Sequence, residues 1–225
     1  MKKFLVLLIF IVGFVLLPVF ADVVPLSSKT IKYHGIGLLN MPRSYTVYQY
    51  PYDDAKATKE SNYDAMTKSA IVSTIDMRKV SYVAYVPENN VAFLTVDLHP
   101  GNNWYRVFLN QETGETGWVY NDNDDDFYTY RRLFYKYGKQ YGIRFYNDLD
   151  DEKKILYSQP TKKSQKLGVV KYPRHITFTV IQGNWLLGMV NEIGSTYKIG
   201  WMRWRNNNGT LNMFPKFKEN SPESL

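Results

Sequence analysis

Residues 102–120, NNWYRVFLNQETGETGWVY, contain two runs of β-branched and aromatic residues on either side of a turn-forming stretch. Residues 104–109 and 117–120 have the composition of strands. Residues 110–115 between them place Gly114 where a hairpin requires a positive φ. The segment therefore predicts a β-hairpin that ends in Gly-Trp-Val.

The same order of signals occurs again further along the chain, in residues 184–202, NWLLGMVNEIGSTYKIGWM. The two Trp residues are 14 positions apart in the first segment and 16 in the second. Sequence self-similarity of this kind indicates a structural repeat. Each copy has a Tyr-x-x-Pro strand, a β-branched run, a Gly/Asn turn into Trp and a closing Gly-Trp: residues 48–51, 91–96, 101–104 and 117–118, then 157–160, 176–180, 182–185 and 200–201.

This pattern resembles the bacterial SH3-like domain, present here in tandem. The resemblance implies an all-β fold of two SH3-like small β-barrels joined by a short helical linker. A closed barrel leaves no strand edge open to other chains. The expected organisation is a signal peptide (1–21), an N-terminal extension (22–44), a first domain (45–121) with an insertion at about 53–86, a helical linker (122–142), a second domain (143–214) and a C-terminal tail (215–225).

The insertion accounts for a difference in length between the two copies. Pro51 and Trp104 are 53 positions apart, whereas Pro160 and Trp185 are 25 apart. Apolar, β-branched runs at residues 70–75 and 80–86 predict added strands within these extra residues.

Between the copies, aromatic residues recur at helical spacing. Asp124, Asp125 and Asp126 precede the run and are expected to cap its first turn, and Gly138 is expected to end it. We expect this helix to pack between the two domains, and the alternative is an exposed aromatic ridge that binds a ligand. The face consists of Phe127, Tyr130, Phe134, Tyr137 and Tyr141.

The first 21 residues have the pattern of a targeting segment, with two Lys residues, an uncharged apolar run at 4–17 and small residues at 19–21. The alternative is an uncleaved anchor, but Gly13 and Pro18 leave the run short of the roughly 20 apolar residues that a membrane span needs. We expect cleavage and export to a bacterial periplasm or to the outside, with no stable insertion in the membrane.

Composition limits the possible functions. The chain has 225 residues, 16% aromatic residues and no Cys, which excludes disulfides, thiol nucleophiles and Cys-based metal sites. The formal charge is +7, or +5 without Lys2 and Lys3, and the basic residues are scattered. Nucleic-acid binding is therefore not expected, because it usually requires a basic stripe. Weak attraction to an anionic wall polymer or to a membrane surface is an alternative to a merely solvated surface.

Motifs for catalysis or metal binding are incomplete. Asp122, Asp124 and Asp126 imitate the start of a calcium loop, but Phe127 occupies the Gly position and Leu133 that of the bidentate Glu. His34, His99 and His175 are isolated. The acidic residues lie in exposed runs without an apolar setting, and Ser164 and Ser195 lack the context of a nucleophile. We expect no enzymatic activity, metal or cofactor.

Members of the SH3-like family commonly bind peptidoglycan peptides, so the resemblance implies a stand-alone binder of cell-wall peptide or glycan. Aromatic rings suit this role because they offer large contact area at low entropic cost. Trp118 and Trp201 are expected to be core anchors, Gly117 and Gly200 to meet backbone requirements, and Trp204 to be exposed. The candidate ligand contacts are Tyr48, Tyr50, Tyr105, Tyr120, Tyr157, Trp185 and Trp204.

Two other functions remain open at this stage. One is a periplasmic assembly module that docks a partner protein, and the other is a cryptic wall hydrolase. Binding to wall material, a co-purifying protein, or release of sugar or peptide would distinguish the three.

Overall fold

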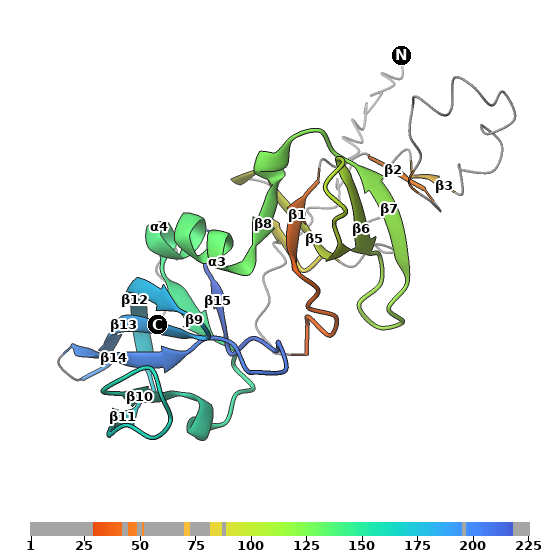
Figure 1. Cartoon of the computed structure of the whole chain (residues 1–225). Helices are drawn as coiled ribbons and strands as arrows, with labels where there is room; N and C mark the ends of the chain where they lie inside the picture. The colour runs from red at the N-terminus through yellow and green to blue at the C-terminus, as the bar shows by residue number, and fades with distance from the viewer. Residues whose placement is uncertain are drawn as a thin grey trace, which may run out of the picture.

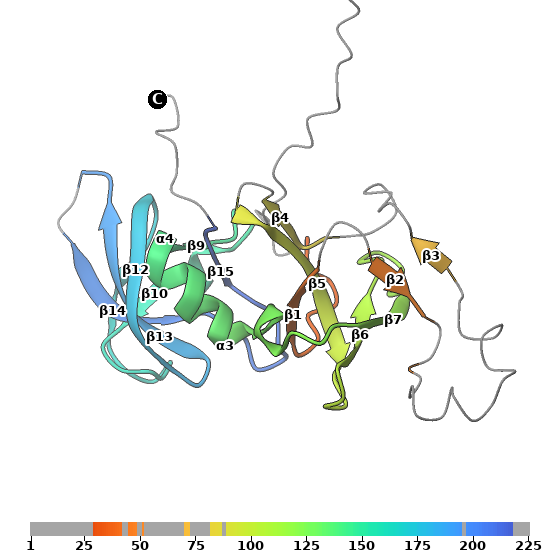
Figure 2. The ribbon, with the colours of Figure 1, turned by 90° about the horizontal axis from the view of Figure 1, so that it is seen from above.

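Most described strands of the protein form two large sheets in separate halves, with a helical segment between them (Figure 1). Seen from above, the same segment again separates the two sets of strands (Figure 2). The expected signal peptide lies outside the described residues. The computed structural model describes residues 29–41, 45–48, 51, 70–72, 82–86, 89–194 and 197–217.

The described part of the chain is rich in short strands, as predicted. The first half contains β1 (Gly37–Asn40), β2 (Tyr45–Val47), β3 (Ala70–Val72), β4 (Ala84–Val86), β5 (Val91–Leu98), β6 (Trp104–Phe108), β7 (Thr116–Tyr120) and β8 (Phe127–Thr129). The second half contains β9 (Ile143–Phe145), β10 (Ile155–Tyr157), β11 (Lys166–Val169), β12 (Pro173–Gln182), β13 (Trp185–Glu192), β14 (Lys198–Arg203) and β15 (Met213–Pro215).

The two halves share one strand order. In the second half the sheet runs β11-β10-β14-β13-β12-β9-β15. In the first half it runs β7-β6-β5-β1-β8, and the backbone of Tyr48 joins the β2-β3 pair to β7 through two hydrogen bonds with Trp118, of 2.7 and 2.8 Å. When strands are numbered within each half and β4 is set aside, both orders read 3-2-6-5-4-1-7. The repeat inferred from the sequence is therefore present in the topology.

Each repeat extends beyond the boundaries expected from the sequence. The outer strands β1 and β8 lie in segments expected to be an extension and a linker, and β15 runs past residue 214 to Pro215. Phe217, expected in the tail, is buried. These strands have only three or four residues, which is too few to show a clear alternation of apolar and polar residues, so the sequence did not indicate them.

Neither sheet closes into a barrel among the described strands, in contrast to the expected small barrels. Burial is achieved by packing instead. β5 has apolar side chains buried on both faces, with Phe93 in a core shared by the two halves and Leu94 in a second core within the first half. A strand covered on both faces reads as a continuous apolar run, as VAFLTV does.

Both strands expected in the insertion are present, at β3 and β4. Only β4 has no counterpart in the second half. It pairs with the first residues of β5, from Val91 to Phe93. β3 takes the same place in the first half as β11 does in the second.

The helical segment is continuous and consists of α3 (Tyr130–Leu133), the π-helical turn η3 (Phe134–Gly138) and α4 (Lys139–Tyr141). It begins later than expected, because Asp124 to Asp126 form a separate 3-10 turn, η2, and Phe127 lies in β8. Thr129 caps the segment by accepting a hydrogen bond from the backbone N–H of Arg132. It ends at Gly142 with φ +83°, and not at Gly138.

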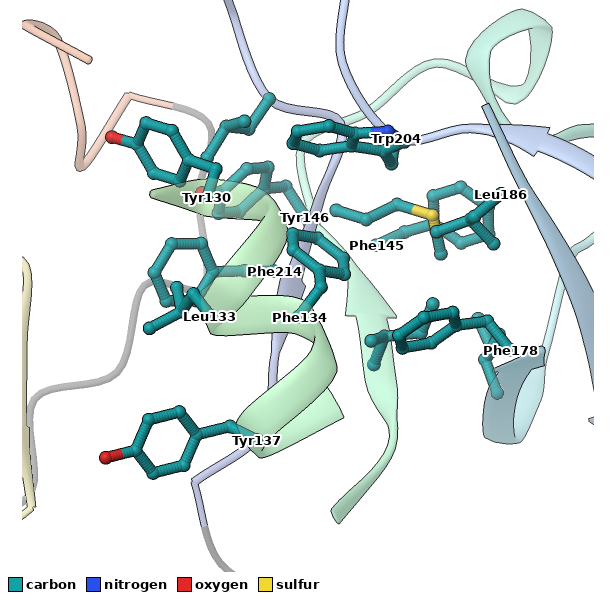
Figure 3. Close-up of a cluster of buried hydrophobic side chains, with 14 of the residues drawn as sticks. Tyr130, Leu133, Phe134, Tyr137, Phe145, Tyr146, Phe178, Leu186, Trp204 and Phe214 are labelled. Carbon is teal, nitrogen blue, oxygen red and sulfur yellow. The ribbon is translucent and has the colours of Figure 1, made fainter. Parts of the chain in front are cut away.

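This segment packs between the halves, as predicted. Phe134 contacts Phe178 and Trp204 of the second half, with ring centroids 6.2 and 5.1 Å apart. On the other side, Tyr137 meets Phe93 of the first half at 5.9 Å. Figure 3 shows Phe134 turned toward Trp204 and Phe178, while Tyr137 points away from them. The described aromatic face is thus core, and not an exposed ridge.

We expect Phe134→Ala to reduce the free energy of unfolding by about 3–5 kcal/mol, because it leaves a cavity among fully buried rings. Gln140→Ala, at an exposed position of the same segment, is the control and should change it by less than about 0.5 kcal/mol. Urea unfolding followed by circular dichroism measures both, and equal midpoints would contradict the packing described.

Candidate functional site

The two repeats place equivalent aromatic residues outside the two hydrophobic cores, where the rings partly bury one another. In the first repeat, Tyr48 packs edge-to-face on Trp104, with centroids 5.2 Å apart at 85°. In the second, Tyr157 packs on Trp185 at 5.4 Å and 86°. Residues directly opposite in an antiparallel pair share a face of the sheet. The pairings of Tyr48 with Trp118 and of Tyr157 with Trp201 therefore add a second Trp to each cluster.

An arginine lies over one indole of each cluster. Arg106 lies 5.8 Å from the Trp118 ring and pairs with Asp97 at 2.6 Å. Arg203 lies 5.7 Å from the Trp185 ring. A guanidinium at this distance is attracted by the ring quadrupole and holds the indole in place.

The glycine before each closing Trp allows a neighbouring strand to approach closely. This strand is β2 for Gly117 and β10 for Gly200. A Cβ atom on Gly117 would lie 2.4 Å from Cγ1 of Val47, which is a severe overlap. A Cβ atom on Gly200 would lie 3.1 Å from both Leu156 and the carbonyl oxygen of Tyr157. The expected backbone role of both glycines is consistent with this close approach.

A groove of about 510 Å³ opens beside the aromatic cluster of the first repeat. Its walls come from the ends of β1 and β7, from β2, from the turn before β5 and from the loop that leads into η2. The lining residues are Asn40, Met41, Tyr45, Tyr48, Asn90, Tyr120, Asn121, Asp122, Asn123 and Asp126.

Aromatic rings form one wall of this groove. Tyr120 is 48% exposed and packs edge-to-face on Trp104 at 5.4 Å. Its hydroxyl accepts a hydrogen bond from Nδ2 of Asn103 at 3.4 Å. Tyr48 also packs on Trp104, so both tyrosine rings that line the groove are held in place by the same indole.

Amide side chains organise the polar parts of the groove. Asn40 accepts a hydrogen bond from the backbone N–H of Ala92 at 2.7 Å and donates one to the carbonyl of Asn90 at 3.0 Å. Nδ2 of Asn121 and Nδ2 of Asn123 both donate to Oδ2 of Asp126, at 3.3 and 3.2 Å. These bonds fix the orientation of the Asp126 carboxylate.

The candidate ligand contacts do not gather at one place. Tyr48 and Tyr120 line the groove, while Tyr157 and Trp185 form the equivalent cluster of the second repeat, in which Tyr157 is buried at 6% exposure and is not available to a ligand. Tyr105 has 0% exposure and faces the core of the first half. Burial, reinforced by the Asp124 carboxylate, raises its pKa to about 12. Tyr50 lies outside the described residues.

The expected exposure of Trp204 is wrong, since the side chain is 4% exposed and its Nε1 donates to the carbonyl of Gly183 at 3.0 Å. The expected burial of Trp118 and Trp201 in the cores is also wrong, because both are only half-buried and belong to neither core. One cause explains these errors. The buried faces of β7 and β14 are those that hold Val119 and Met202, and not those that hold Trp118 and Trp201.

Most residues of the groove were not identified from the sequence. Asn90 lies 45 positions after Tyr45 and 50 after Asn40, and none of the three residues belongs to a motif. The Asn-Asp sequence at 121–126 was a visible signal, but as a calcium loop it lacked the required Gly and Glu. Within the described ranges, no group of three or more His, Asp or Glu side chains is placed to hold a metal ion.

The three histidines lie away from the groove. Burial, with Arg205 nearby, lowers the pKa of His34 to about 4, so the imidazole is neutral at pH 7. His99 stacks on Tyr105 at 4.2 Å, and His175 is exposed. No helix in the described portion is long and apolar enough to cross a bilayer.

Comparison with protein families, with characterised proteins and with solved structures finds no match to this chain. The site is therefore interpreted from its own geometry.

We expect Gly117→Ala to lower stability by about 1–3 kcal/mol, because the added methyl group overlaps Val47. Gly200→Ala should lower the free energy of unfolding by a smaller amount, because the nearest contacts of its added methyl group would be 0.7 Å longer than those at Gly117. Urea unfolding monitored by Trp fluorescence would measure both, with Thr116→Ala at the exposed neighbouring position as control. The reverse order of the two glycine variants would refute this explanation.

Proposed function

We propose that this chain is an exported, non-catalytic binding protein of two SH3-like repeats that recognises peptide or glycan of the cell wall. The observation that carries the proposal is the groove of the first repeat, where the exposed ring of Tyr120 and the half-buried ring of Tyr48 lie beside fixed amide and carboxylate groups. Concave sites that combine apolar surface with a few oriented polar groups are typical of ligand binding.

The repeat geometry supports the SH3-like assignment. In each half, three consecutive strands form an antiparallel meander, and the last of them pairs with an earlier strand that carries the Tyr of the Tyr-x-x-Pro motif. The motif residues that suggested the family therefore meet in space. The open sheets are a departure from a closed barrel, and each is extended by two further strands.

The location follows from the apolar segment over residues 4–17 and the small residues that come after it. Export would bring the groove into contact with wall polymers. It would also suit a chain without Cys, which needs no oxidation step.

A second candidate function, docking of a partner protein, is favoured by a different surface. Met189 and Ile199 pair across β13 and β14 and are 40% and 63% exposed. Ile193 and Tyr197 flank the same hairpin and are also exposed. Exposed apolar side chains that adjoin one another often mark an interaction surface.

We expect the purified protein to sediment with isolated peptidoglycan sacculi in a saturable way that is weakened but not abolished by raised salt, because rings and amides of the groove contribute in addition to charge. Tyr120→Ala should weaken binding about tenfold or more. Tyr172→Ala removes a tyrosine that is 69% exposed in the second half and serves as the matched control.

Three results would count against this function. Equal loss in both variants would indicate a nonspecific effect of losing a surface ring. Binding that disappears with salt would reduce the interaction to charge attraction. No sedimentation, together with a protein that co-purifies, would favour the docking function.

A further inference from the structure

The described lining of the groove in the first repeat is acidic, whereas the chain as a whole is basic. The whole sequence has a formal charge of +7. Among the described residues that line the groove, Asp122 and Asp126 are acidic, and none is Lys, Arg or His. Two carboxylates at the rim of an aromatic groove favour a cationic ligand and disfavour an anionic one.

The neighbouring carboxylates of the same loop are already engaged. Asp125 pairs with Arg132 at 2.6 Å, and Asp124 accepts a hydrogen bond from the Tyr105 hydroxyl at 3.4 Å. Within the described ranges, Asp122 and Asp126 form no ion pair. The two carboxylates that face the groove are therefore the ones available for a ligand.

The carboxylate of Asp126 is already oriented before a ligand binds. Its Oδ2 accepts both amide hydrogen bonds, from Asn121 and Asn123, and both donors are neutral. The carboxylate is thus oriented without being neutralised. Preorganisation of this kind reduces the entropic cost of binding.

A pair of buried hydroxyls lies at the lining of the same groove. Tyr45 is a lining residue with only 8% exposure, and its hydroxyl lies next to the buried hydroxyl of Tyr82. Apart from each other, these two hydroxyls have no hydrogen-bond partner among the described residues. Burial raises the pKa of Tyr45 well above its usual range, so its hydroxyl stays protonated. Buried hydroxyls with unused hydrogen-bonding capacity favour a ligand or water that can supply a further partner.

We propose that the groove binds a primary ammonium group of a peptide, with Asp122 and Asp126 around the charge and Tyr48 and Tyr120 against the alkyl chain that carries it. An ammonium has three donors and no acceptor, which matches carboxylate and amide oxygens. Aromatic faces also attract cations. This inference rests on the proposed function and narrows the ligand from wall polymer in general to a wall peptide with a free amine.

The alternatives fit the groove less well. A neutral glycan would make no use of the two charges, and an anionic polymer would be repelled by them. A metal ion would need more ligands than these two carboxylates, and no group of three metal-binding side chains exists in the described part of the chain.

The test compares sacculi with free amines and the same sacculi after acetylation with acetic anhydride. We expect the protein to bind untreated sacculi at least tenfold more tightly than acetylated sacculi. The double variant Asp122→Asn/Asp126→Asn should bind untreated sacculi as weakly as the original protein binds acetylated sacculi. Asp125→Asn is the matched control, because it makes the same chemical change outside the groove, and should bind within about twofold of the original protein.

A second measurement separates this inference from the proposed function. Acetyl-Ala-Lys-Ala-amide and its ε-acetylated form are titrated while Trp fluorescence is recorded, and only the free amine should bind. Equal binding to both kinds of sacculi would overturn the inference and leave the wall-binding function intact. Binding of the free-amine peptide without any binding to sacculi would refute the wall function and support the amine site. No response to either peptide, or an equal loss in the Asp125→Asn control, would overturn the amine site.

Discussion

The structure depends on a helical segment with large aromatic side chains on two sides. Phe134 contacts the second half and Tyr137 contacts the first, so the same short segment completes the cores of both sheets. Neither sheet closes on itself among the described strands, and each therefore needs cover from outside. The hydrophobic effect at this junction makes the two repeats one folded unit.

The glycines of the segment show how tight this junction is. A Cβ atom on Gly138 would lie 2.8 Å from Ile143 and 3.0 Å from Phe178, and one on Gly142 would lie 2.6 Å from His175. Gly138 is thus required by packing, while Gly142 also has the positive φ that ends the helix. This explains why the sequence suggested the wrong glycine as the end: both residues are needed, for different reasons.

Local sequence signals predicted the parts of the fold that depend on local chemistry. The hairpin turn at Gly114, with φ +76°, the repeated Gly-Trp and the bridging helix all agree with the structure. The prediction of which face of each strand is buried was wrong. Alternation shows which residues of a strand lie together, but it does not tell which face is buried, so Trp118, Trp201 and Trp204 were assigned to the wrong sides. The groove could not be predicted because its residues meet only after the repeat has folded.

The shared strand order also explains how two similar repeats can differ in recognition. The segment between the sixth and seventh strands of each repeat leaves the sheet next to the aromatic cluster. In the first repeat it contains Asp122 and Asp126, which line the groove. In the second repeat the same segment begins with Trp204, which turns into the core, and continues with Arg205, whose guanidinium lies 5.7 Å from the Tyr130 ring. The same strand order thus presents the carboxylates of Asp122 and Asp126 in the first half. In the second half it places the guanidinium of Arg205 against an aromatic ring of the core. The loop after the closing hairpin, and not the aromatic cluster that both repeats share, is therefore the element that distinguishes the first repeat as the proposed binding unit.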